Sequence, residues 1–258
     1  SQTTQSKYNS YIGKTCTKDS LDTNIDYKSR ETIISQPPTL NISNIDTTKG
    51  HKTRLDPGFM LKSYDLEPFN YILFNSSIEP RKNLLFLLEV YRSTEFLIRN
   101  NIKLCVVGKF ENKKDKYVNS AMTIMNNVDG IVFSGYVSEN QKLDFYLNTI
   151  TLVSPSLVEG YGIPVLDACC MGIDVLASNC EAHREIFSKY DFKSYMKLID
   201  LSDLKKWRDE LELLLYKFHG SNLDIDKERI KRINRYKKYS EMINASYEET
   251  LIDICKHN

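Results

Sequence analysis

The sequence lacks an excess of charge of either sign and a long apolar run. Its 258 residues carry 35 Lys and Arg against 34 Asp and Glu, a net charge of +1. A chain with no overall basic field is not expected to bind nucleic acid. No apolar stretch approaches the roughly 20 residues that span a bilayer, and the polar N-terminus is not typical of a signal peptide. The hydrophobic fraction of 41% and charged fraction of 27% indicate a globular protein.

Cysteine occurs six times, but without the spacing of a metal or redox motif. No two cysteines form a Cys-x-x-Cys pair, and most lie in apolar runs, where Cys packs as a small hydrophobic residue. The four histidines stand in unrelated contexts, so no metal site is predicted. We therefore expect a reduced, cytoplasmic protein.

Composition changes near residue 68. Residues 1–67 are rich in Ser, Thr, Asn, Asp and Lys and are interrupted by prolines, which predicts an N-terminal segment or linker. Residues 68–258 alternate short apolar runs with amphipathic stretches. Apolar strands separated by helices indicate an α/β, doubly wound parallel sheet covered on both faces. The predicted strands are 71–74, 103–107, 130–133, 151–153, 175–177 and 195–199; the predicted helices are 83–99, 116–126, 139–148, 163–171, 183–187 and 204–217, with one or two more over 226–257.

Ligands of such sheets bind at the carboxyl ends of the strands, so the loop after the first predicted strand is the first candidate site. This loop, residues 75–83 (Asn-Ser-Ser-Ile-Glu-Pro-Arg-Lys-Asn), is here named the phosphate loop. It combines hydroxyl groups, the adjacent cations Arg81 and Lys82, and a helix start, which together favour a phosphate or diphosphate. The alternative is a surface Arg-Lys pair beside a helix that begins at a proline.

The second candidate is the loop after the fourth predicted strand, residues 154–162, here named the glycine loop. Gly160 and Gly162 allow a ligand to approach the backbone closely. Glu159 precedes them and Asp167 follows on the next helix, so two carboxylates could bind hydroxyl groups at two ends of an elongated ligand such as a sugar and a ribose. The alternative is a capped helix with acids that face solvent. A third glycine is missing, which excludes a dinucleotide fingerprint and hence a dehydrogenase.

Together the two loops resemble a known family. Ile78-Glu79-Pro80-Arg81-Lys82-Asn83 is similar to the "EPRKN" loop, and the run from Ser154 to Pro164 to the "S-x-x-E-G-F/Y-G-I-P" loop, of the retaining GT-B glycosyltransferases of family 4. Ala177-Ser178-Asn179 and Arg184-Glu185 match the segments that usually follow. The resemblance extends from Tyr71 to about Phe218 and implies the C-terminal, donor-binding domain of that fold.

The resemblance also implies roles for individual residues. The catalytic residues would be Arg81 and Lys82, which hold the donor's diphosphate and stabilise the charge of the leaving nucleotide, and Glu159, which binds the donor sugar. No metal or other cofactor is implied. Asp167 stands where the family has a second glutamate that binds ribose, and Asn75-Ser76 where a glycine is usual. The implied donor-binding residues are Ser77, Val137, Gly160, Tyr161, Gly162, Ile163 and Asp167.

The implied function is transfer of a sugar from a nucleoside-diphosphate sugar to a glycan acceptor with retention of configuration, as in a hexosyltransferase of polysaccharide biosynthesis. The 67 residues that precede the donor domain are too few for the family's N-terminal acceptor domain. We expect that domain in a longer chain or in a partner subunit, or a degenerate N-terminal segment in its place. The alternatives are a non-catalytic nucleotide-sugar-binding or scaffolding module, and another GT-B reaction such as epimerisation.

The C-terminal region carries a basic run from Lys227 to Lys238, with seven basic residues and one acidic residue. Two interpretations are open: a helix face that is solvated or docked on another domain, and a peripheral contact with anionic lipids at the inner face of a membrane. Asp224-Ile225-Asp226 has the letters of a DxD motif but precedes a helix, so we interpret it as a helix cap.

Overall fold

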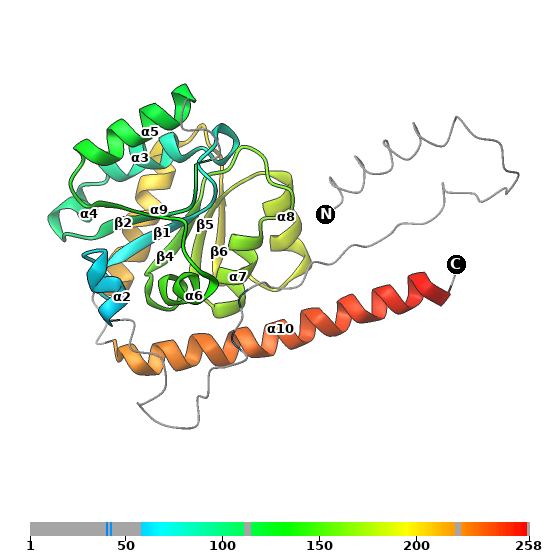
Figure 1. Cartoon of the computed structure of the whole chain (residues 1–258). Coiled ribbons are helices and arrows are strands. Elements are labelled where there is room, and N and C mark those ends of the chain that lie inside the picture. The colour runs from blue at the N-terminus through cyan, green and yellow to red at the C-terminus, as the bar shows by residue number, and fades with distance from the viewer. Residues whose placement is uncertain (1–39, 41, 43–57, 111–114, 220–222, 257–258) are drawn as a thin grey trace, which may run out of the picture.

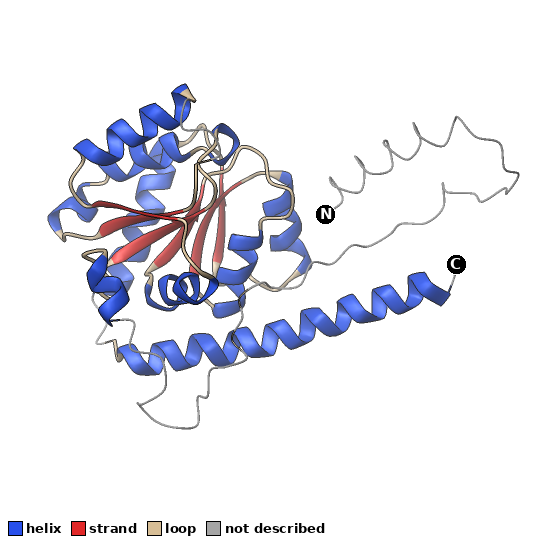
Figure 2. Cartoon of the chain, viewed as in Figure 1, coloured by secondary structure: helices blue, strands red, loops and turns tan. Residues whose placement is uncertain are grey.

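The computed structural model describes residues 40, 42, 58–110, 115–219 and 223–256, and most of the predicted segment 1–67 lies outside these residues. The described residues form a six-stranded parallel sheet between two layers of helices (Figures 1 and 2), so the α/β, doubly wound class is confirmed. The strands are β1 (Tyr71–Asn75), β2 (Lys103–Val107), β3 (Ile131–Gly135), β4 (Thr151–Ser154), β5 (Asp174–Ser178) and β6 (Met196–Ile199).

The strand order is β3-β2-β1-β4-β5-β6, which makes β1 and β4 the central neighbours. They are parallel, with Leu73 opposite Leu152. The chain winds outward in one direction from β1 and in the other from β4, so the loops after these strands diverge and leave a crevice at the carboxyl edge. The phosphate loop follows β1 and the glycine loop follows β4. The topology therefore brings the two predicted loops together.

Successive side chains of each strand point to opposite faces of the sheet and so belong to two separate buried cores. In β1, Tyr71 and Leu73 belong to one buried cluster and Ile72 and Phe74 to the other, as expected when both faces of a sheet are covered. The first cluster packs against α2 (Gly58–Ser63), α6 (Glu139–Asn148), α7 (Ile163–Met171), α8 (Glu181–Lys189) and α10 (Ile225–Lys256); the second packs against α3 (Leu84–Ser93), α4 (Glu95–Arg99), α5 (Lys116–Asn127) and α9 (Leu204–His219).

One helix was predicted over residues 83–99, and this is wrong. Thr94 is fully buried and has extended backbone angles (φ −96°, ψ 93°), which separates α3 from α4. Its hydroxyl donates to the carbonyl oxygen of Val90 at 2.7 Å. A threonine side chain that bonds the backbone in this way competes with continuation of the helix. The amphipathic pattern runs through both helices, so it did not indicate the break.

The packed domain begins before the boundary that composition suggested. Leu61 of α2 and Leu66 are buried in the first cluster, and Leu40 and Ile42 join it. Their burial shows that part of the N-terminal segment belongs to the core of this domain. No helix among the described residues is long and apolar enough to cross a membrane.

The C-terminal region is a single helix, α10, of 32 residues that packs along α7 and α6. The Asp224 carboxylate accepts the backbone N–H of Lys227 at 3.1 Å, so the interpretation of the Asp-x-Asp sequence as a helix cap is confirmed. The Arg232 guanidinium donates to the carbonyl oxygens of Tyr146 at 3.0 Å and Thr149 at 2.8 Å. It thereby satisfies the acceptors that the end of α6 leaves open.

These contacts change the interpretation of the basic run. Arg229 and Arg232 are buried, and the Arg235 guanidinium lies 4.3 Å from the ring centroid of Tyr195. Lys227 and Lys231 pair with Asp224 and Glu228. The run is therefore partly docked on its own domain and does not present a continuous free basic face. Peripheral membrane contact stays a prediction. The basic run offers less exposed cationic surface for it than the sequence indicated.

Candidate functional site

The phosphate loop and the glycine loop are joined at the carboxyl edge of β1 and β4. The backbone N–H of Leu157 donates to the carbonyl oxygen of Arg81 at 2.8 Å. The Lys82 ammonium lies 2.5 Å from one carboxylate oxygen of Glu159, and the Ser156 hydroxyl donates to the other at 2.7 Å. The side chains of Lys82 and Glu159 are only 8% and 7% exposed. Three side chains from two loops thus form one buried polar cluster.

Arg81 forms the open side of this cluster. Its side chain is 46% exposed; one guanidinium nitrogen lies 2.6 Å from Glu79 and another 3.8 Å from Glu159. The Ser77 hydroxyl also donates to Glu79, at 2.6 Å. Burial raises the pKa of the Glu79 carboxyl, but the hydrogen bonds from Ser77 and Arg81 outweigh it and leave that pKa below its usual value. Glu79 therefore holds Arg81 at the rim, a role that sequence reasoning missed although the residue stood inside the quoted motif.

Local backbone geometry separates the two cations. Pro80–Lys82 form a 3₁₀ turn, and Asn83 then adopts a left-handed conformation (φ 57°) from which α3 begins. Proline fits the first position of such a turn, and asparagine tolerates a positive φ better than most residues. As a result Lys82 lies inside the cluster and Arg81 remains at its edge.

Buried polar residues of β5 and α8 connect the glycine loop to the rest of the domain. The His183 ring is fully buried, and its Nδ1 lies 2.9 Å from the carbonyl oxygen of Ser178. The Ser178 hydroxyl donates to the carbonyl oxygen of Ser156 at 2.5 Å. Its burial and its contact with Ser178 give His183 a structural place beside the loop. Ser178 was missed, although its position at the end of a predicted strand was a signal.

Gly162 is the position in the glycine loop with the least room for a side chain. It has φ +86°, and a Cβ there would lie 3.1 Å from Ile186 and 3.2 Å from His183. We expect Gly162→Ala to lower the free energy of unfolding by about 1–3 kcal/mol, because it adds left-handed strain and a contact with buried side chains. Chemical denaturation of the whole chain measures this.

Gly160→Ala is the matched control for that substitution. A Cβ at Gly160 meets nothing within 4 Å. This variant is expected to unfold within about 0.5 kcal/mol of the original protein. Equal losses for both variants would contradict the packing argument.

The structure places the remaining predicted residues around these loops at different depths. Asp167 is 2% exposed and accepts a hydrogen bond from the Tyr236 hydroxyl of α10 at 2.8 Å. It lies inside the domain, and its predicted ribose contact stays a prediction. Val137 is buried after β3, Tyr161 is buried in the glycine loop, and Ile163 begins α7.

The described residues contain no group of three His, Cys, Asp or Glu side chains that could hold a metal ion. Cys169 and Cys170 of α7 are buried against the sheet, and burial raises the pKa of both thiols far above the usual value. These two cysteines are therefore packing residues. The candidate chemistry of the described chain lies in its two loops.

Residues 61–212 match the model of the family described as "Glycosyl transferases group 1", which is more than half of the chain and includes both loops. The chain belongs to this family. The match begins at α2, in agreement with the packing of Leu61 and Leu66 into the domain.

This glycosyltransferase family member is similar in sequence to several bacterial proteins. The chain is 29% identical over 127 residues to the O-antigen chain mannosyltransferase B of Escherichia coli, covering 49% of this chain and 33% of that protein. It is 28% identical over 154 residues to Protein CapJ of Staphylococcus aureus, covering 57% and 39%. These alignments span only about a third of each relative's length.

Solved structures share the fold at lower identity. WaaG, described as a glycosyltransferase involved in lipopolysaccharide biosynthesis, superposes with a TM-score of 0.54 at 19% identity, over 80% of this chain and 51% of that chain. A trehalose-6-phosphate synthase superposes with a TM-score of 0.53 at 11% identity, over 79% and 50%. The present chain thus corresponds to one Rossmann-like half of a GT-B fold.

Proposed function

We propose that this chain is the donor-binding domain of a retaining, hexosyltransferase-type glycosyltransferase that uses a nucleoside-diphosphate sugar. The observation that carries the proposal is the contact between Lys82 and Glu159, with Arg81 beside it, at the point where β1 and β4 diverge. In this contact two cations that would bind phosphate lie next to an acid that would bind sugar hydroxyls. Membership of the family supports the same reaction class.

The cluster has free capacity for a ligand. A lysine ammonium has three donors, and the contact with Glu159 uses one, which leaves two for phosphate oxygens. Arg81, half exposed at the rim, can add a charged hydrogen bond to the same diphosphate. Glu159 can accept further bonds from sugar hydroxyls beyond those from Lys82 and Ser156. The diphosphate and the sugar would therefore lie side by side across the two loops.

In the proposed reaction, the bond between the anomeric carbon and the diphosphate oxygen breaks, and the oxygen of an acceptor hydroxyl forms a new bond to that carbon. The hydroxyl proton passes to the leaving diphosphate oxygen. The electron pair and negative charge go to the leaving nucleoside diphosphate. Arg81 and Lys82 would stabilise this charge as it develops, because preorganised cations bind the transition state more strongly than the ground state. We propose that no divalent metal is needed, since the two cations supply that stabilisation.

The acceptor would be a glycan held by another domain or a partner subunit. Two relatives support a glycan, because their names refer to O-antigen chains and lipopolysaccharide biosynthesis. The chain spans about a third of the curated relatives and half of the solved neighbours. The base, the donor sugar and the acceptor are left to experiment.

Calorimetric titration of the chain with UDP, GDP, ADP and dTDP, with a chelator present, tests the proposal. We expect one nucleotide to bind with a micromolar to millimolar Kd, and its sugar derivative to bind at the same site. An unchanged Kd after Mg²⁺ is added supports binding without a metal. If none of the four binds up to several millimolar, the assignment as a donor domain is wrong.

A further inference from the structure

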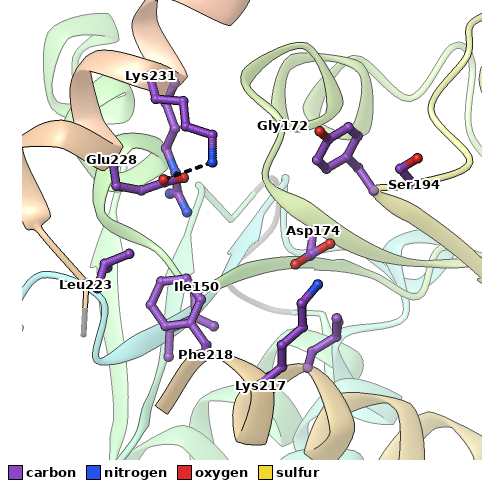
Figure 3. A pocket seen from close by; sticks show the side chains of 12 residues that line it. Ile150, Gly172, Asp174, Ser194, Lys217, Phe218, Leu223, Glu228 and Lys231 are labelled. Carbon is purple, nitrogen blue, oxygen red and sulfur yellow. Dashed lines mark hydrogen bonds and ion pairs between the residues drawn. The ribbon is translucent and has the colours of Figure 1, made fainter. Parts of the chain in front are cut away.

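A separate pocket lies at the opposite, amino-terminal edge of the sheet (Figure 3). It has a volume of about 270 Å³ and is formed where β5 begins, between the end of α9 and the start of α10. Asp174 is the first residue of β5, whereas the donor loops follow the last residues of β1 and β4. Because parallel strands share one direction, this pocket and the donor loops lie at opposite edges of the sheet.

Charged groups of both signs face this pocket. Figure 3 shows Asp174 and Lys217 directed into the same space, with Glu228 and Lys231 on its other side. The Lys231 ammonium lies 3.2 Å from Glu228. Arg232 is almost fully buried behind Glu228, at 3.4 Å from it, and donates to the carbonyl oxygens at the end of α6. Both cations and acids therefore line the pocket.

This arrangement selects against several ligand classes. An anion would face Asp174 and Glu228, and a cation would face Lys217 and Lys231. An apolar ligand would remove all four groups from water without giving them hydrogen bonds, which costs free energy. A neutral ligand with several hydroxyl groups meets neither objection, because a hydroxyl donates to a carboxylate and accepts from an ammonium.

The walls of the pocket favour the same class. Phe218 and Tyr195 contribute aromatic rings, and Ile150 and Leu214 contribute apolar side chains. Aromatic and apolar side chains beside polar groups that can orient a ligand are typical of small-molecule sites. The volume lies just below the usual range of about 300–1,000 Å³ for such sites. It therefore suits one small ring better than a nucleotide.

We propose that this pocket binds one neutral sugar ring of a glycan, remote from the donor loops. Asp174 and Glu228 accept hydrogen bonds from the sugar hydroxyls, Lys217 donates to them, and Phe218 packs against the apolar face of the ring. The site would tether a glycan chain at the edge of the sheet away from the reaction. The inference does not depend on which nucleotide the donor loops bind.

NMR titration of the ¹⁵N-labelled whole chain tests this site. The probes are methyl α-mannoside, methyl α-glucoside, methyl α-galactoside and methyl N-acetyl-α-glucosaminide, with glucose 6-phosphate and inorganic phosphate as charged probes. We expect at least one neutral glycoside to shift the amide signals of Gly172, Ser194 and Leu223 with a millimolar Kd. Phosphate and glucose 6-phosphate should bind there more weakly. No shift with any neutral glycoside, or tighter binding of phosphate, overturns the proposal.

Two variants and their matched controls connect the shifts to the pocket. Asp174→Asn and Lys217→Met should each weaken glycoside binding by about tenfold, because each removes a charged hydrogen bond. Asp209→Asn and Lys205→Met alter an exposed ion pair on α9 outside the pocket and should leave the Kd unchanged. Lys217 is exposed, so Lys217→Met keeps the fold even if Asp174→Asn does not. Equal affinity in Lys217→Met and in the original protein would contradict the assignment.

Failure of this site is distinguishable from failure of the donor site. Arg81→Ala alters only the rim of the donor loops and should leave glycoside binding at the pocket unchanged. Conversely, Lys217→Met should leave the affinity for nucleoside diphosphate unchanged. Signals that shift in the phosphate and glycine loops, in place of those around Gly172, would show that the glycoside binds at the donor site and would overturn the proposal.

Discussion

Replacing Arg81 and Lys82 together with Ala should weaken nucleoside-diphosphate binding by about 2–4 kcal/mol, because each residue contributes a charged hydrogen bond to the diphosphate. That corresponds to a roughly 30- to 1,000-fold rise in Kd. The two residues should contribute unequally to this loss of affinity, and Lys82 should contribute more. Its side chain is held against Glu159 and is 8% exposed, whereas Arg81 is 46% exposed and screened by water. Calorimetric titration of the single and double variants measures both contributions.

Folding has to be controlled for Lys82, because its removal leaves Glu159 buried without its cation. Arg81→Ala removes only a rim residue and should unfold like the original protein. A double variant of two exposed cations, Arg99→Ala with Lys205→Ala, matches the loss of charge away from the loops, since both pair with exposed acids. If the control weakens binding as much as the loop variant, the effect is general electrostatics and the phosphate assignment is wrong.

Replacing Glu159 with Ala should weaken binding of the nucleotide sugar without weakening binding of the free nucleotide. Glu159 accepts from Lys82 and Ser156 in the structure. Without it, all three Lys82 donors become available to a diphosphate, so the affinity for free nucleoside diphosphate should stay the same or rise. The nucleotide sugar loses the acceptor for its hydroxyls and should bind about tenfold more weakly. Parallel titrations with the diphosphate and its sugar derivative measure both changes.

Ser156→Ala is a useful comparison for Glu159→Ala. Its hydroxyl orients Glu159 but is buried, 1% exposed. We expect a smaller loss for the nucleotide sugar and no change for the free nucleotide. If Glu159→Ala weakened binding of both ligands equally, Glu159 would support the loop as a whole and would not bind the sugar specifically.

The order of elements followed from sequence because the strands are mostly apolar and most helices between them are amphipathic; α7 is instead buried at seven of its nine positions. These patterns are local, so β1 to β6 and most helices lie where they were predicted. The break at Thr94 was missed because it depends on the Thr94 hydroxyl, which donates to the carbonyl oxygen of Val90 in a buried environment. The docking of the basic run was missed for a related reason. Arg229 and Arg232 are bound by groups of α6 that are more than 80 residues away in sequence.

The sequence by itself determined the two candidate loops, since the residue types that bind phosphate and sugar stand next to predicted strand ends. It also determined that Gly162 precedes a helix and that Arg81 and Lys82 are adjacent. Only the tertiary structure decided that Lys82 and Glu159 touch, that Arg81 stays at the rim with Glu79, and that Asp167 faces Tyr236. Spacing along a chain specifies local conformation, whereas contacts between loops depend on strand order, and the meeting of β1 and β4 is a property of the whole sheet.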